Sequence, residues 1–233
     1  MSLVFEIPSL PSAAVAGTTE RFPVGRIFCV GRNYAAHAAE MGQTEREAPF
    51  FFTKFPQALV AGGGTVPYPP ATSNFHYEGE LVIAIGKAGA KLDPKSALDV
   101  VFGYACGLDF TRRDLQFALR DKGRPWDVGK NFAHAAPLGT IRPAKQGHFE
   151  RGAITLTVDG ETKQHGDVSD MIWSCAEILA HLSTLERLLP GDLVYTGTPA
   201  GVGPVKPSNV IEVTVDGLEP LRVTVGAPDP AFA

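Results

Sequence analysis

Several features of membrane, secreted and nucleic-acid-binding proteins are missing from this sequence of 233 residues. No stretch approaches the roughly 20 consecutive apolar residues of a membrane-spanning helix. The opening MSLVFEIPSL has an acidic residue and prolines where a secretory signal needs a basic start and an unbroken apolar run. We therefore expect a cytoplasmic protein with no membrane partner.

The charge pattern excludes a second group of functions. The formal net charge is −4, and the 21 lysines and arginines form no basic block. Nucleic acid and anionic membranes are therefore poor candidates for a partner, and a small molecule is the better one. Cysteine is also scarce. Cys29, Cys106 and Cys175 lie in apolar surroundings without CxxC spacing, which predicts buried thiols rather than a disulfide or a zinc site.

Glycine and proline are abundant, at 25 and 19 residues, and they fall between short β-branched runs. This pattern predicts a strand-rich fold with many loops. Two hairpins are expected, in ITLTVDGETKQ and VIEVTVDGLEPLRVTV, because each alternates apolar and polar residues across an Asp-Gly pair suited to a type I′ turn. The glycine-rich AGGGTV and TGTPAGVGP lack phosphate-loop spacing and are interpreted as turns.

Helices are expected to be few and short. Segment 93–101 has a capping Asp93 and a proline in its first turn, segment 111–123 runs from a capping Thr111 to a stop at Gly123, and segment 169–182 carries an apolar stripe. The stripe comprises Met171, Cys175, Ile178, Leu179 and Leu182. The fold class predicted is mixed α+β and β-rich. Residues 1–20 are expected to form an N-terminal lead-in segment and residues 21–233 a single catalytic domain.

Three carboxylates carry the chemical signal. Glu78 and Glu80 in HYEGELVIAIGK point to the same side of a strand, about 6 to 7 Å apart along the chain. A solvated strand edge explains such a pair taken alone. Asp109, however, ends the apolar run VVFGYACGLDF, where it can face a cavity. A hard divalent cation accepts three such oxygens and removes their repulsion, which favours Mg²⁺ or Mn²⁺ at Glu78, Glu80 and Asp109.

Candidate partners for a bound anion follow Asp109. Arg113 and Gln116 share a helix face at i, i+3 spacing, and Lys130 follows in DVGKNF. Each is also compatible with an ordinary surface position. A short alanine-rich segment, GRNYAAHAAEMG, places His37 and Glu40 at the same spacing. There the carboxylate can raise the basicity of the imidazole so that it takes a proton from water, although a surface contact is the alternative.

These residues occur in motifs that resemble the fumarylacetoacetate hydrolase family. The resemblance covers roughly residues 20–225 and rests on six blocks in order: GRNYAAHAAEMG, HYEGELVIAIGK, GLDFTRRDLQ, RPWDVGKNF, GDVSDMIWS and PGDLVYTGTPAGVGPV. Within the family, RFPVGRIFCVGRNYAAHAAEMG and ALRDKGRPWDVGK look most like the bacterial enzymes that hydrolyse fumarylpyruvate in gentisate breakdown.

The resemblance implies a fold, a cofactor and residue roles. It implies a β-roll or sandwich, assembled as a homodimer, with Mg²⁺ or Mn²⁺ at Glu78, Glu80 and Asp109. It also implies a lid on which His37 and Glu40 activate water. The residues expected to contact substrate are Lys54, Arg113, Gln116, Lys130 and Thr198, and Lys130 is also expected to act in catalysis. One departure is that FTKFPQAL has Phe55 between Lys54 and Pro56, where the family commonly reads F-x-K-P.

The function expected is hydrolysis of a carbon–carbon bond in a ketonic substrate. An acylpyruvate, with fumarylpyruvate favoured, would give fumarate and pyruvate in aromatic catabolism. Because charge stabilisation at a metal also serves other reactions, an oxaloacetate decarboxylase or a 2-hydroxyhepta-2,4-diene-1,7-dioate isomerase is the nearest alternative. A metal-dependent module that binds small oxo-acids is the non-enzymatic alternative.

Overall fold

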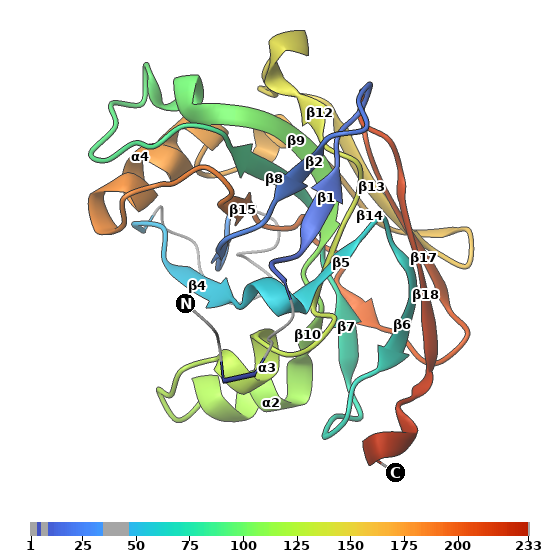
Figure 1. Ribbon diagram of the computed structural model, residues 1–233. Helices are drawn as coiled ribbons and strands as arrows, with labels where there is room; N and C mark the ends of the chain where they lie inside the picture. The colour runs from blue at the N-terminus through green and yellow to red at the C-terminus, as the bar shows by residue number, and fades with distance from the viewer. Residues whose placement is uncertain (1–3, 6–8, 35–46, 233) are drawn as a thin grey trace.

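The fold is known from a computed structural model that describes residues 4–5, 9–34 and 47–232. The largest sheet has eight strands, in the order β4-β3-β15-β8-β9-β11-β5, with β12 paired to β9. Their bounds are β3 Ile27–Val30, β4 Phe51–Lys54, β5 Leu59–Ala61, β8 Gly79–Ile85, β9 Val101–Leu108, β11 Ala136–Leu138, β12 Arg142–Pro143 and β15 Leu193–Tyr195. This sheet curls into a half-barrel (Figure 1).

A second sheet has five strands in the order β14-β13-β17-β18-β6. It comprises β6 Gly64–Tyr68, β13 Ala153–Val158, β14 Glu161–Asp167, β17 Val210–Val215 and β18 Leu221–Pro228. Alternate residues of β13 and β17 are buried, and these two strands pack against β8 and β9 of the first sheet. All seven residues of β8 are consequently buried.

Smaller elements complete the described fold. A three-stranded sheet has the order β10-β7-β16, with β7 Phe75–Tyr77, β10 Thr111–Arg112 and β16 Gly203–Pro204. The α-helices are α2 Arg113–Arg120, α3 Asp127–Lys130 and α4 Cys175–Leu185, and 3-10 helices span Pro56–Ala58, Ala97–Val100, Ala144–Gln146, Val168–Asp170 and Pro230–Phe232. In Figure 1, α2 and α3 lie together at the bottom of the molecule, next to β10. The predicted strand-rich fold with few short helices is confirmed.

The N-terminal residues take part in a strand pair. β1 Ser12–Ala14 pairs with β2 Arg21–Pro23, and Ala13 is fully buried. The amide of Ala16 donates to the carbonyl of Ile141 at 2.9 Å. The division into a lead-in segment and a catalytic domain stays a prediction. No helix in the described part of the chain is both long enough and apolar enough to cross a membrane.

Both expected hairpins form, but only one has the expected turn. Asp159 and Gly160 join β13 to β14 with φ of 52° and 83°, as a type I′ turn requires. The second Asp-Gly pair does not form this turn, because Gly217 has a positive φ of 78° and Asp216 does not. Asp216 instead receives a hydrogen bond on its carboxylate from the amide of Ala153 at 3.0 Å, and the connection to β18 is longer. A contact with a neighbouring strand therefore overrides the local turn preference.

The predicted helices are shorter than their sequence segments. Segment 93–101 forms only the 3-10 helix Ala97–Val100, and α2 ends at Arg120, shortly before Gly123. Thr111 does not cap α2, because it lies in β10 and its hydroxyl donates to the carbonyl of Asp109. α4 begins after Ser174, with Met171 outside the helix and the other four stripe residues buried. The three cysteines are buried and unpaired, as predicted.

A capping box begins α4 and predicts a measurable stability effect. The Ser174 hydroxyl accepts from the amide of Glu177, whose carboxylate accepts from the amide of Ser174 at 2.9 Å. Ser174→Ala should lower the free energy of unfolding by about 1 kcal/mol, because an N-terminal amide of the helix loses its acceptor. Urea unfolding followed by circular dichroism measures this. Thr184→Ala on the same helix is the matched control and should change stability by less than about 0.5 kcal/mol. Equal losses would contradict the capping role.

Candidate metal centre

Two neighbouring strands place three carboxylates at one end of the largest sheet. β8 and β9 are antiparallel, with Gly79 opposite Leu108 and Glu80 opposite Gly107. Glu78 precedes β8 and Asp109 follows β9, and the amide of Asp109 donates to the carbonyl of Glu78 at 2.9 Å. This bond extends the ladder by one step beyond the strands. The two-residue repeat of a strand then brings Glu80 to the same side as Glu78.

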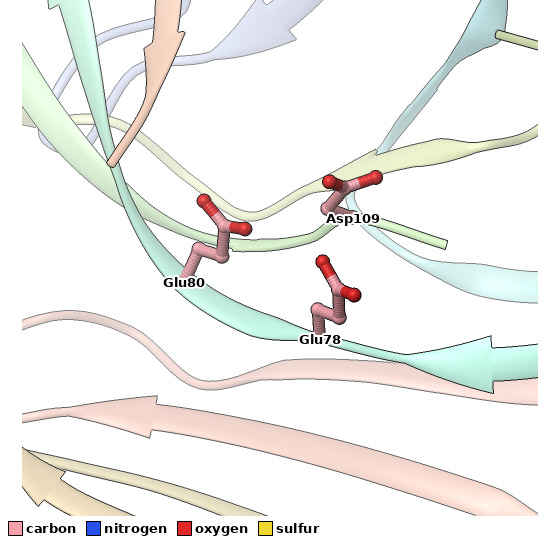
Figure 2. A group of neighbouring side chains, drawn as sticks. All are labelled: Glu78, Glu80 and Asp109. Atoms are coloured by element: carbon pink, nitrogen blue, oxygen red, sulfur yellow. The ribbon is translucent and has the colours of Figure 1, made fainter. Parts of the chain in front are cut away.

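The three carboxyl groups meet in a buried space. One oxygen of each of Glu78, Glu80 and Asp109 lies within 4.8 Å of the others. Their exposed fractions are 5%, 1% and 1%. Figure 2 shows the two glutamates rising from one strand and the aspartate from the next, with their carboxyl groups gathered together. The structure thus brings together the three residues that the sequence predicts as metal ligands.

Buried bases surround two of these carboxylates. The Nζ atom of Lys130 lies 2.7 Å from Glu78 Oε2 and 2.7 Å from Asp109 Oδ2. Lys54 Nζ lies 2.8 Å from Asp109 Oδ1, and Arg113 pairs with Glu78 Oε1. Three positive side chains therefore balance three negative ones in the absence of any ion.

Glu80 differs from the other two carboxylates. It accepts a hydrogen bond from the amide of Gly197 at 2.7 Å and forms no ion pair within the described ranges of the chain. Burial, followed by the charges of Asp109 and Glu78, raises the pKa of Glu80 well above its usual value. Gly197 has a φ of 97°, and a Cβ there would lie 2.8 Å from that of Asn33, so glycine is required where this amide meets the carboxylate.

Lys130 is held in its charged form. Burial by itself lowers the pKa of its ammonium group, but the neighbouring charges of Asp109 and Glu78 outweigh burial and raise the pKa. α3 carries Lys130 at its end and packs closely against α2, since a Cβ on Gly129 would lie 2.9 Å from the backbone of Gln116. Close packing of the two helices therefore fixes the lysine relative to the carboxylates.

The first turn of α2 supplies a second oriented group. The Arg113 guanidinium donates to Gln116 Oε1 at 2.5 Å, as expected for residues three apart on one face, and both side chains are buried. Arg113 Nε lies 3.4 Å from His76 Nδ1, while His76 Nε2 lies 2.9 Å from Asn74 Oδ1. Burial, then the charge of Arg113, lowers the pKa of His76 to about 4. A neutral imidazole can accept a hydrogen bond, so His76 helps to orient Arg113.

The other two predicted substrate contacts, Lys54 and Thr198, donate hydrogen bonds to backbone carbonyls near the carboxylates. Lys54 donates to the carbonyl of Phe110 at 3.1 Å and to that of Lys130. The Thr198 hydroxyl donates to the carbonyl of Gly79 at 2.8 Å and accepts from Gln164 Nε2 at 2.8 Å. Both side chains hold the backbone around the carboxylates in place, and their contact with a substrate stays a prediction.

The predicted water-activating pair, His37 and Glu40, lies outside the described residues. Its role stays a prediction.

Sequence reasoning missed two buried amide side chains. Gln164, on β14, accepts from the amide of Gly79 at 2.9 Å and so ties the second sheet to the segment between the glutamates. Asn33 donates to the carbonyls of Trp173 and Thr196 at 2.9 and 2.8 Å and accepts from the amide of Trp173. These partners lie 140 and 163 residues away from Asn33 in sequence, so no local pattern could reveal them.

The donor set fits a hard divalent cation. Among the described residues, the potential metal ligands that converge here are all carboxylate oxygens. The buried Glu80, which has no ion-pair partner in that part of the chain, is the position where a positive charge is most needed. Zinc sites usually include histidine or cysteine ligands, whereas Mg²⁺ and Mn²⁺ accept oxygen ligands alone.

Comparison with known proteins agrees with this geometry. Residues 26–226 match the family described as "Fumarylacetoacetate (FAA) hydrolase C-terminal". The chain belongs to the fumarylacetoacetate hydrolase family. It is 52% identical over 180 residues to the fumarylpyruvate hydrolase of Ralstonia sp, which covers 77% of this chain and 94% of that protein. The predicted family is thereby confirmed.

Two further similar proteins bear on the site. The crystal structure of fumarylpyruvate hydrolase from Pseudomonas aeruginosa in complex with Mn²⁺ and pyruvate aligns with a TM-score of 0.94 and 48% identity, over 97% of this chain and 100% of that one. The mitochondrial oxaloacetate decarboxylase of Dictyostelium discoideum is 41% identical over 196 residues, covering 83% of this chain and 90% of that protein. The predicted fold type is therefore confirmed, and a divalent metal suits the acidic triad.

Metal binding provides a direct test of the carboxylate cluster. Glu80→Gln should weaken Mn²⁺ binding at least about 100-fold, because the site loses one charged oxygen ligand. Isothermal titration calorimetry of the metal-free protein measures the affinity. Glu219→Gln, at an exposed position outside the cluster, is the control and should leave the affinity unchanged. Unchanged Mn²⁺ affinity in Glu80→Gln would contradict the site.

Proposed function

We propose that the protein is a metal-dependent hydrolase that cleaves the carbon–carbon bond of an acylpyruvate, with fumarylpyruvate as the substrate and fumarate and pyruvate as products. The observation that carries the proposal is the buried cluster of Glu78, Glu80 and Asp109, balanced by Lys130, Lys54 and Arg113. The 52% identity to the fumarylpyruvate hydrolase of Ralstonia sp supports the substrate.

Charge complementarity favours a substrate with an anionic pyruvyl end. Because the three bases cancel the three carboxylates, a divalent ion held by Glu78, Glu80 and Asp109 would leave an excess of two positive charges. The pyruvyl carboxylate accounts for one of these, and the charge that develops on the pyruvyl oxygens as the bond breaks accounts for the other. The bound Mg²⁺ or Mn²⁺ would supply Lewis-acid stabilisation of that developing charge.

The protein's own residues would orient the substrate and move protons. Arg113 and Gln116, hydrogen-bonded to each other, present a guanidinium and an amide beside Glu78 for the anionic end. We assign the deprotonation of the attacking water to His37, assisted by Glu40, on the strength of the family resemblance. Lys130, kept as an ammonium group by its two carboxylates, would return a proton to the carbon of the departing pyruvyl group.

The cellular setting is also part of the proposal. Buried, unpaired cysteines suit a reducing compartment, which supports the cytoplasm as the location. The family resemblance supports a homodimer and a place in gentisate breakdown, within aromatic catabolism.

Decarboxylation of oxaloacetate is the second candidate, favoured by the 41% identity to the decarboxylase of Dictyostelium discoideum. Both reactions use a metal and a nearby ammonium group, but decarboxylation needs no attacking water. Product analysis therefore distinguishes the hydrolase from the decarboxylase. It also distinguishes the hydrolase from an isomerase and from a binding module.

The decisive measurement is product stoichiometry. Metal-free protein supplied with Mg²⁺ or Mn²⁺ and fumarylpyruvate should release fumarate and pyruvate in equal amounts, because water adds across one carbon–carbon bond. Enzymatic assay of both products, alongside loss of the enol absorbance, measures this, and metal-free protein is the control. A parallel incubation with oxaloacetate tests the second candidate. Absence of fumarate and pyruvate release from fumarylpyruvate, with carbon dioxide formed from oxaloacetate, an isomer of unchanged mass formed, or binding without turnover, would contradict the hydrolase proposal.

A pair of variants tests the division of roles. Glu78→Ala should abolish metal-dependent turnover and weaken Mn²⁺ binding, because it removes a proposed ligand. His37→Ala should reduce turnover by about 100-fold or more while sparing Mn²⁺ affinity, because a general base acts on water rather than on the metal. Turnover rates and calorimetric affinities measure the two effects. Equal loss of metal affinity in both variants would refute this division.

A further inference from the structure

A cavity of about 410 Å³ adjoins the candidate metal centre. Its lining includes the aromatic rings of Phe50, Phe52 and Trp126 and the charged groups of Arg124, Asp127 and Lys130. The volume is in the range of small-molecule sites and well above what a four-carbon chain needs.

Lys130 connects this cavity to the carboxylates. Its Nζ atom, 2.7 Å from Glu78 and from Asp109, also lies 5.0 Å from the centre of the Phe52 ring. One ammonium group thus borders both the metal centre and the cavity wall. A substrate whose pyruvyl end lies at the carboxylates can therefore extend its other end past Lys130 into the cavity.

The cavity walls suit a flat, conjugated chain. The Trp126 ring lies 5.3 Å from that of Phe50, nearly perpendicular to it, and 6.1 Å from that of Phe52. Aromatic faces of this kind pack well against planar, conjugated groups. The fumaryl group is planar and conjugated, and it ends in a carboxylate.

Arg124 differs from Lys130, the other cation of the lining. Lys130 is already paired with Glu78 and Asp109. Arg124 is exposed, and within the described ranges its guanidinium has no ion-pair partner. A guanidinium presents two parallel donors that match a carboxylate.

We propose that this cavity holds the distal acyl group of the substrate and that the Arg124 guanidinium binds its terminal carboxylate. Arg124 is then the residue that selects acylpyruvates with a second carboxylate over those without one. The inference rests on the proposed acylpyruvate hydrolase function.

The test compares fumarylpyruvate with acetylpyruvate, which has the same pyruvyl end and no distal carboxylate. Arg124→Gln should lower the ratio of kcat/KM for fumarylpyruvate to that for acetylpyruvate by about tenfold, because one charge-assisted pair is lost. Arg124→Lys, which keeps the charge and loses the fork, should give an intermediate ratio.

Matched variants separate a specific contact from a general effect of charge or shape. Arg120→Gln removes the same charge four residues away, where the guanidinium pairs with Asp121, and should leave the ratio unchanged. Asp127→Asn removes the acidic group of the lining and should raise the ratio. Equal losses in Arg124→Gln and Arg120→Gln would overturn the proposal, and so would a fall in Asp127→Asn.

A second guanidinium, that of Arg32, is an alternative binding group for the distal carboxylate, and the same experiment tests it. Arg32 lies 5.9 Å from the centre of the Phe50 ring, and its buried Nε has no hydrogen-bond partner among the residues that the structure describes. A loss of selectivity in Arg32→Gln, with Arg124→Gln unchanged, would overturn the assignment to Arg124.

Binding measurements keep this inference distinct from the proposed function. If the wild-type protein hydrolyses neither compound, the hydrolase function fails. Calorimetric affinity of the Mn²⁺-loaded protein for fumarylpyruvate then decides about Arg124. An affinity about tenfold lower in Arg124→Gln than in the wild type supports the contact, and equal affinities overturn it.

Discussion

The site depends on one electrostatic constraint: three carboxylates share a small volume from which water is largely excluded. Isolated charges in such a place are costly, so each must be paired or neutralised. Lys130 bridges Glu78 and Asp109, and Lys54 and Arg113 pair with one each. Glu80, bonded to the Gly197 amide, is left as the carboxylate with the strongest need for a cation. A divalent ion would therefore supply Glu80 with the cationic partner that it lacks among the described residues.

The fold satisfies this constraint by bringing distant segments to the end of β8 and β9. Gln164 reaches from the second sheet to the amide of Gly79, and Thr198 bonds the carbonyl of the same residue. Gly79 itself packs against Leu156, since a Cβ there would lie 3.0 Å from that side chain. Gly79, between the two glutamates, is therefore held through its amide, its carbonyl and its packing against Leu156. A rigid backbone of this kind keeps the like-charged carboxylates close together. On a flexible segment, their repulsion would move them apart.

Local patterns in the sequence account for much of this arrangement. The ExE spacing predicts that Glu78 and Glu80 share a side, because side chains alternate along a strand. The end of an apolar run predicts Asp109 at the mouth of the core. The pairing of Lys54 with Asp109 is not predictable in this way, since it depends on how the sheet curls. Local sequence likewise does not predict the conformation of Asp216. Its carboxylate accepts a hydrogen bond from Ala153, 63 residues away in sequence, and it does not form the type I′ turn that Asp-Gly favours. The family resemblance supplies what local pattern cannot, including the fold type.

The charges of the proposed substrate indicate that it binds across two regions, the candidate metal centre and the adjoining cavity, which meet at Lys130. A divalent ion would bring the metal centre to an excess of two positive charges, and the pyruvyl carboxylate and the charge that develops during bond cleavage use both. A second carboxylate at the far end of fumarylpyruvate then has no counter-charge at the metal centre. It needs one elsewhere, and Arg124 stands in the adjoining cavity without an ion-pair partner among the described residues. Because Lys130 is the one described residue that the two regions share, substitutions in the cavity can alter which acyl group is accepted while the proposed metal-binding carboxylates remain the same.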